Sequence, residues 1–161
     1  MTTAMPQLDA PRFENGQAML IAGLRGHFTT ATWAGIFAQW ERMVSHGKVP
    51  GAVGPVHYGL CFLSPDGIDY LCGVEVEAVS GLPAEFTRTN IPAQKYAVFV
   101  HHEHASKLYD TMEAIWQWFP GSHYEIAQPV NGAPNFFERY GPEFSPVTGK
   151  GDIEVWIPVK S

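Results

Sequence analysis

Apolar positions along the chain form strand-like runs and helical stripes, and their order predicts a mixed α+β fold. The run over residues 17–24 is almost continuously apolar, which indicates a buried strand. Thr29 and Thr30 can cap a helix that runs to about His46, where Gly47 ends it. One stripe of this predicted helix carries Trp33, Phe37, Trp40 and Val44.

Two strands are predicted next, over residues 57–63 and 68–79. The turn between them, Ser64-Pro65-Asp66-Gly67, is typical of a hairpin.

The same order of elements then begins again. A short strand is predicted over residues 86–89 and a buried strand over 96–101. A second helix is predicted over 106–119, with Leu108, Met112, Ile115 and Phe119 on one stripe. The last predicted strands cover residues 124–127, 135–140 and 153–159.

This repetition predicts a duplicated half-domain. Overlaying Gln17 on Gln94 brings Trp40 within one residue of Trp118, and a period this long does not fit a solenoid. Each strand–helix–strands half leaves an apolar face uncovered, so the halves must share a sheet with a central cleft. We therefore expect a flexible tail over residues 1–12 and one domain over 13–161. The expected pseudo-repeats cover about 17–85 and 86–160.

Composition narrows the class of protein. The 161 residues fit one domain, and 10 Lys and Arg stand against 16 Asp and Glu without any basic cluster. This balance argues against direct binding to nucleic acid and favours cationic ligands. No apolar run approaches the roughly 18 residues of a membrane span. Without a leader-like start, Cys61 and Cys72 fit reduced thiols, so we expect a cytoplasmic protein with no membrane association.

The segment Asn135-Phe136-Phe137-Glu138-Arg139-Tyr140 carries the most chemistry. On a strand, Phe136, Glu138 and Tyr140 share one face. If that face points inward, the carboxylate is a buried charge among aromatic rings, which suits an organic cation. If it points outward, Glu138 faces water and pairs with a Lys or Arg of a neighbouring strand. Alternation alone leaves both arrangements open.

Several segments together resemble the GyrI-like effector-binding family. They are IPAQKYAVFVHHEHASKLYDTMEAIWQWFP, FFERY, IEVWIPV and DYLCGVEV, and their order and distances are more specific than any one of them. Members of this family include drug-binding domains of MerR- and AraC-type transcription regulators, the gyrase inhibitory protein, and stand-alone forms carried on integron cassettes. The resemblance covers nearly the whole chain from about residue 17.

The resemblance implies a curved antiparallel sheet with two helices, duplicated about a pseudo-two-fold axis, with a central aromatic pocket. In multidrug-binding members the Glu of the motif similar to FERY meets the positive charge of the ligand, and this role transfers to Glu138. The other candidate wall residues are Phe136, Tyr140, Trp33, Phe37, Tyr58, Tyr109, Trp116 and Trp156. For each of these taken singly, core packing is the alternative.

One departure from the family pattern concerns the end of the second buried strand. The family usually has a small residue there, often Gly, whereas this chain has His101-His102-Glu103-His104. Adjacent strand residues point apart and no partner cluster has ligand spacing, so we expect no metal site and a solvated strand–helix turn. The sequence also shows no phosphate loop and no nucleophile elbow, and we expect no cofactor and no catalytic residue.

Three functions fit these features. The first is a binding module for a cationic, aromatic or amphipathic drug-like molecule. Because the chain leaves no room for a helix-turn-helix domain, we expect it to act as a sink, or as a sensor through a partner regulator chain or a homodimer. The second is a hydrolase of strained cyclopropane-type electrophiles, with Glu138 as general base. The third is a protein inhibitor of a gyrase-like target, which rests on analogy alone.

Overall fold

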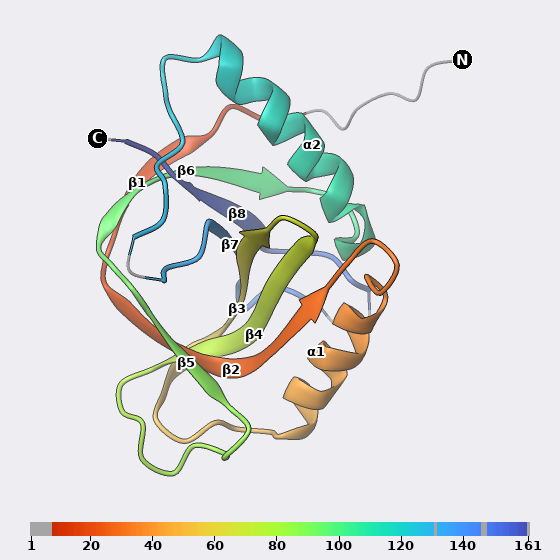
Figure 1. Ribbon diagram of the computed structural model, residues 1–161, viewed down its shortest axis with the longest axis vertical. Coiled ribbons are helices and arrows are strands. Elements are labelled where there is room, and N and C mark those ends of the chain that lie inside the picture. Colours follow the sequence, from red (N-terminus) through yellow and green to blue (C-terminus); the bar gives the residue numbers. More distant parts are fainter. Residues whose placement is uncertain (1–7, 131, 146–147, 161) are drawn as a thin grey trace.

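In the described part of the chain, eight antiparallel strands form one curved sheet, and two helices pack on one side of it (Figure 1). This computed structural model describes residues 8–130, 132–145 and 148–160. The elements are β1 (Arg12–Gly16), β2 (Met19–Phe28), α1 (Gly35–Ser45), β3 (Ala52–Ser64), β4 (Gly67–Val76), β5 (Thr87–Ile91), β6 (Gln94–His101), α2 (Leu108–Trp118), β7 (Phe136–Tyr140) and β8 (Ile153–Pro158). Short 3₁₀ turns, η1 (Ala105–Lys107) and η2 (Phe119–Gly121), flank α2.

The strand order shows how the two halves share the sheet. It runs β1-β6-β8-β7-β3-β4-β2-β5, and exchanging β1–β4 with β5–β8 gives the same order reversed. A pseudo-two-fold axis therefore passes between β3 and β7. Each half contributes two strands, a helix and two strands, and its first strand pairs with the other half. The predicted α+β fold, with duplicated halves sharing an antiparallel sheet and two helices, is confirmed.

The edge strand β1 was not predicted. Its sequence is polar and exposes Arg12, and it pairs with β6 so that Arg12 lies opposite Val98. An edge strand of this kind needs no apolar alternation, because the neighbouring strand supplies the hydrogen bonds. Of the tail expected over residues 1–12, residues 1–7 lie outside the described part of the chain, and Arg12 belongs to β1.

Two other expectations about local structure were wrong. Thr29 and Thr30 do not cap α1, which begins at Gly35; instead the backbone N–H of Thr29 donates to Thr32 Oγ1 at 2.8 Å and closes a turn. Residues 124–127 form no strand, because only one bridge joins Ile126 to Val159. The segment is held by aromatic packing instead: the ring of Tyr124 stacks on the ring of Phe13 of β1, with the two ring centroids 4.3 Å apart.

The sheet buries a different apolar layer on each face. The side that carries the helices packs against Met43 of α1 and Ile115 of α2. The other side forms a second cluster built on Ile21, Tyr58, Leu60, Leu71, Ile91, Tyr96, Val98 and Phe137. Alternate residues of every central strand are thus committed to opposite layers, which decides what can reach the helices.

Within the described ranges, no helix has both the length and the apolar character needed to cross a membrane. Cys61 and Cys72 are both buried and unbridged, as expected for reduced thiols.

Candidate functional site

The candidate site lies where the central strands β3 and β7 pair. Gly59 lies opposite Glu138, with His57 opposite Tyr140 and Cys61 opposite Phe136. Phe136, Tyr140 and Cys61 belong to the apolar layer under the helices, so the alternation of β7 directs Glu138 to the same side. The carboxylate therefore lies at the centre of the sheet, on its helical side.

Glu138 is buried and hydrogen-bonded to two hydroxyl groups. Tyr70 donates to Oε1 at 2.6 Å and Tyr140 donates to the same oxygen at 2.9 Å. Burial raises the pKa of Glu138 above its usual value, and the two hydroxyls offset part of that rise. The ion pairs formed among the described residues do not include Glu138. Among the described residues, the carboxylate is thus held by the neutral hydroxyls of Tyr70 and Tyr140.

The second carboxylate oxygen, Oε2, has a different environment. Within residues 8–130, 132–145 and 148–160, no side chain donates to it. Glu138 as a whole is 9% exposed, and Oε2 is its oxygen without a donor among these residues. Of the two oxygens, Oε2 is the one that a ligand can meet.

Gly59 makes room for this arrangement. A Cβ atom built at Gly59 would lie 2.1 Å from the Tyr70 hydroxyl oxygen and 2.7 Å from Glu138 Oε1. Any side chain at this position would displace both groups. Gly59 was not among the predicted site residues, although a glycine inside an apolar strand often marks a close approach of another group.

Each helix packs one indole against an aromatic ring that flanks Glu138 on β7. Trp40 of α1 packs edge-to-face on Tyr140, with ring centroids 5.3 Å apart. Trp116 of α2 packs in the same manner on Phe136, at 5.5 Å. Because Phe136 and Tyr140 flank Glu138 on its strand, the two indoles lie on either side of it. We refer to Trp40, Gly59, Tyr70, Trp116, Phe136, Glu138 and Tyr140 as the Glu138 site.

Four of the predicted site residues meet here, namely Glu138, Phe136, Tyr140 and Trp116. Tyr58 and Trp156 lie on the opposite face of the sheet, where both rings pack against Phe137 at 5.6 and 5.5 Å. Their neighbours in sequence occupy the helical side, so alternation directs Tyr58 and Trp156 away from the carboxylate.

The remaining three predicted residues are exposed. Trp33 precedes α1, whereas Phe37 lies on α1 and Tyr109 on α2; their exposed fractions are 42%, 59% and 62%. Phe37 lies three residues before Trp40, and Tyr109 seven before Trp116, so each shares a helix side with the indole.

The structure adds Trp40, Gly59 and Tyr70 to the predicted set. Trp40 was recognised as part of the helical stripe but not as a site residue. Its indole N–H donates to the Tyr70 hydroxyl at 3.1 Å, and Tyr70 in turn donates to Glu138. Tyr70 and Gly59 lie far from Glu138 in the sequence and reach it through the pairing of β4, β3 and β7, whereas Trp40 reaches it through the packing of α1 on the sheet.

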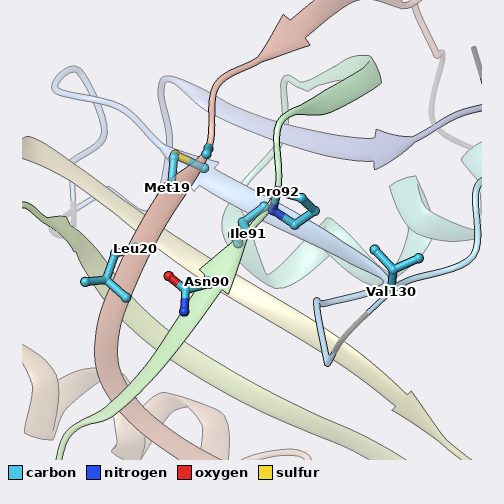
Figure 2. A pocket seen from close by; sticks show the side chains of 7 residues that line it. Met19, Leu20, Asn90, Ile91, Pro92 and Val130 are labelled. Atoms are coloured by element: carbon cyan, nitrogen blue, oxygen red, sulfur yellow. The ribbon is translucent and has the colours of Figure 1, made fainter.

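A separate hollow of about 540 Å³ opens at the start of β2 and the end of β5 (Figure 2). Its lining consists of Ala18, Met19, Leu20, Asn90, Ile91, Pro92 and Val130. None of these side chains is charged or titratable, and Glu138 is not among them. The hollow offers apolar surface without the chemistry of the Glu138 site, so we place the candidate function at Glu138.

The histidine run after β6 does not converge on one point. His101 is buried, against the expectation of a solvated turn, and shares a hydrogen bond with Thr111 of α2 at 2.7 Å. His102 pairs instead with Asp9 on the surface. Among the residues that the structure describes, no group of three or more His, Cys, Asp or Glu side chains could hold a metal ion.

Comparison with known proteins assigns the chain to a family. A family model described as Cass2, integron-associated effector binding protein, matches residues 14–159. The transcriptional regulator BrlR of Pseudomonas aeruginosa strain PAO1 is 30% identical over 146 residues, which cover 88% of this chain and 52% of the regulator. The chain therefore spans about half the length of this relative.

Solved structures share the fold. SAV2435 bound to tetraphenylphosphonium superposes with a TM-score of 0.72 at 22% identity, over 94% of both chains. The Vibrio cholerae integron cassette protein VCH_CASS2 has a TM-score of 0.65 at 18% identity, over 95% of this chain and 97% of its own. EcmrR in its DNA complex has a TM-score of 0.66 at 13% identity, over 96% of this chain but 58% of its own.

Proposed function

The chain belongs to the integron-associated effector-binding proteins of the GyrI-like family, and from that membership we propose that it binds a bulky organic cation at the Glu138 site. This assignment confirms the resemblance identified in the sequence. The family supplies the general role of effector binding. The charge and shape of the ligand are inferred from the residues around Glu138.

One observation carries the proposal: Glu138 is a buried carboxylate that no cation of the described residues neutralises. An ionised group in such surroundings is costly unless a charge of opposite sign compensates it. A bound cation would supply that charge at Oε2. The indoles of Trp40 and Trp116 and the rings beside Glu138 would favour the same ligand, because aromatic faces attract cations.

The relatives support this choice of ligand. Tetraphenylphosphonium, the molecule bound to SAV2435, is a cation surrounded by aromatic rings. A ligand of this kind would satisfy Glu138 and cover the exposed rings of Phe37 and Tyr109. Since the relative BrlR is a transcriptional regulator, we propose that this chain acts as a sink for the ligand or as a sensor that works through a partner chain.

The test uses two probes of the same shape and opposite charge, tetraphenylphosphonium and tetraphenylborate. The intrinsic fluorescence of the five Trp residues reports binding. We expect the wild type to bind the cation and not the anion. Glu138→Gln should lower the affinity for the cation more than about 100-fold, since removing one partner of a buried charge pair costs about 3–5 kcal/mol.

The matched control is Glu125→Gln, which makes the same chemical change at an exposed carboxylate. It should bind tetraphenylphosphonium as the wild type does. Equal affinity for the two probes, together with an unaffected Glu138→Gln variant, would remove the basis of the proposal.

A hydrolase remains the second candidate, and one observation favours it. Burial raises the pKa of Glu138, and both described donors bond Oε1 and leave Oε2 free of them, an arrangement that suits a general base that activates water. Turnover of a strained cyclopropane electrophile by the wild type, lost in Glu138→Gln with the fold intact, would establish this activity. Binding without turnover would leave Glu138 as a counter-ion.

A further inference from the structure

We propose that Tyr70, held in place by Trp40, is a positioning residue that decides which oxygen of Glu138 meets the ligand and at which pH binding begins. The inference rests on the proposed function, because it assigns a role within the Glu138 site. The role assigned to Tyr70 is to set the pH at which the Glu138 carboxyl group ionises, in addition to the binding of the ligand itself.

The direction of the hydrogen bonds fixes the Tyr70 hydroxyl. The Trp40 indole can only donate, and it gives its hydrogen to the Tyr70 oxygen at 3.1 Å. A hydroxyl has one hydrogen, and that of Tyr70 is directed to Glu138 Oε1 at 2.6 Å. Together with Tyr140, this occupies Oε1 and leaves Oε2 as the oxygen that faces the ligand.

The pseudo-two-fold axis shows that this hydroxyl is not needed for packing. The axis exchanges Gly59 with Glu138, and it exchanges the pair Cys61–Tyr70 with the pair Tyr140–Ile153. Ile153 therefore occupies in the second half the place that Tyr70 occupies in the first, and it is completely buried. An apolar side chain fills the equivalent position, so the Tyr70 hydroxyl belongs to the site rather than to the architecture.

The groups around Glu138 leave the hydroxyls as the determinants of its charge. The titratable side chains on this face of β3, β4 and β7 are Tyr70, Tyr140, Cys61, Cys72 and His57, and the helices contribute the uncharged indoles of Trp40 and Trp116. Burial raises the pKa of Cys72 to about 11, so this thiol is neutral near pH 7. Burial raises the pKa of the Cys61 thiol and lowers the pKa of the His57 imidazole, so both groups are neutral near pH 7. The two Tyr hydroxyls are then the described groups that favour the ionised carboxylate.

The decisive experiment is a carbon-13 NMR titration of the Glu138 carboxyl group in the ligand-free protein. Tyr70→Phe removes the donor at nearly constant volume, and Trp40→Phe removes the anchor of that donor. We expect the titration midpoint to rise in Tyr70→Phe and to rise less in Trp40→Phe. The control is Tyr96→Phe, a buried Tyr on the opposite face whose hydroxyl bonds Gln94, and its midpoint should equal that of the wild type.

Tetraphenylphosphonium binding is then measured against pH in the same proteins. Below the midpoint the affinity should fall about tenfold per pH unit, since only the ionised fraction binds. The fall should begin at higher pH in Tyr70→Phe, and the affinities should converge at high pH. Unchanged NMR midpoints in Tyr70→Phe and Trp40→Phe would overturn the inference.

The two readouts separate the two proposals. A wild type that binds no tetraphenylphosphonium at any pH would refute the proposed function, while the NMR midpoints would still decide the role of Tyr70. If Tyr70→Phe does not fold, as judged by near-ultraviolet circular dichroism, Trp40→Phe still tests the same chain of hydrogen bonds, because Trp40 donates to Tyr70 and Tyr70 donates to Glu138.

Discussion

Gly59 and Glu138 lie opposite each other on β3 and β7, where the pseudo-two-fold axis crosses the sheet. The axis makes each the equivalent of the other. One half of the duplicated fold thus supplies a carboxylate, and the other half supplies the space that the carboxylate and the Tyr70 hydroxyl occupy. A symmetric scaffold acquires a single charged centre because the two halves differ at this pair.

Gly59→Ala is expected to disrupt the Glu138 site, because the added methyl group would project from β3 into the contact between Tyr70 and Glu138. The added methyl group would lie 2.1 Å from the Tyr70 hydroxyl oxygen, and that oxygen is held on both sides by hydrogen bonds. Overpacking of this kind typically costs about 1–3 kcal/mol of folding free energy. Chemical denaturation should show the loss, and tetraphenylphosphonium affinity should fall with it.

Gly54→Ala is the matched control, because a Cβ atom at Gly54 meets nothing within 4 Å. Its unfolding free energy and its affinity should stay close to those of the wild type. Equal behaviour of the two variants would mean that the Tyr70–Glu138 contact adjusts without cost.

Glu138→Gln is expected to change the pH dependence of stability as well as binding. The pKa of Glu138 is raised in the folded protein, so the folded state holds its proton more tightly than the unfolded state. The stability linked to this group is fully present below the unfolded pKa and is lost as pH rises through the folded pKa. Relative to Glu138→Gln, the wild-type melting temperature should therefore fall between about pH 4 and neutrality.

Differential scanning calorimetry across that range checks the prediction. The amide of Gln can still accept hydrogen bonds from Tyr70 and Tyr140, so the fold should persist. A constant difference in melting temperature across the range would contradict the assignment of a raised pKa to Glu138.

The architecture was predictable because it depends on local patterns repeated twice. Apolar runs and helical stripes recur in the same order, and two halves with uncovered faces must share a sheet. Strand alternation also placed Phe136, Glu138 and Tyr140 on one face. It could not say that this face lies under the helices, because that depends on long-range packing.

The partners of Glu138 could not be predicted, because they depend on register between strands. Tyr70 and Gly59 reach the carboxylate only through the pairing of β4, β3 and β7. The same register directs Tyr58 and Trp156 to the opposite layer. A shift of one residue would exchange the two faces, and nothing local in the sequence fixes that choice.

Phe37→Ser is expected to weaken ligand binding without destabilising the fold. Phe37 is 59% exposed and lies on the same side of α1 as Trp40, so loss of its ring removes little packing. Its contact with a bulky aromatic ligand should be lost, however. Val79→Ser, at an exposed apolar residue that follows β4, should leave affinity unchanged. Equal tetraphenylphosphonium affinities of the two variants would show that the ligand does not contact Phe37 and binds only the residues of the Glu138 site.

Gln39→Leu tests whether α1 is held by a polar anchor. Gln39 is buried, and its amide nitrogen donates to the backbone oxygens of Leu24 at 3.0 Å and Tyr70 at 2.9 Å. Leucine removes both bonds, so the two backbone oxygens lose the donor that α1 supplies. The expected cost is about 1–3 kcal/mol in unfolding free energy. Because one of these oxygens belongs to Tyr70, the Glu138 site should be loosened as well.

Gln117→Leu makes the same chemical change at an exposed position of α2, and surface substitutions of this kind usually stay within about 0.5 kcal/mol. Chemical denaturation of the two variants therefore isolates the contribution of burial from that of the side chain itself. If both variants unfold as the wild type does, apolar contacts such as those of Met43 are sufficient to hold α1 on the sheet. If Gln39→Leu loses both stability and ligand affinity while Gln117→Leu loses neither, the Gln39 amide both holds α1 on the sheet and positions β4, which carries Tyr70.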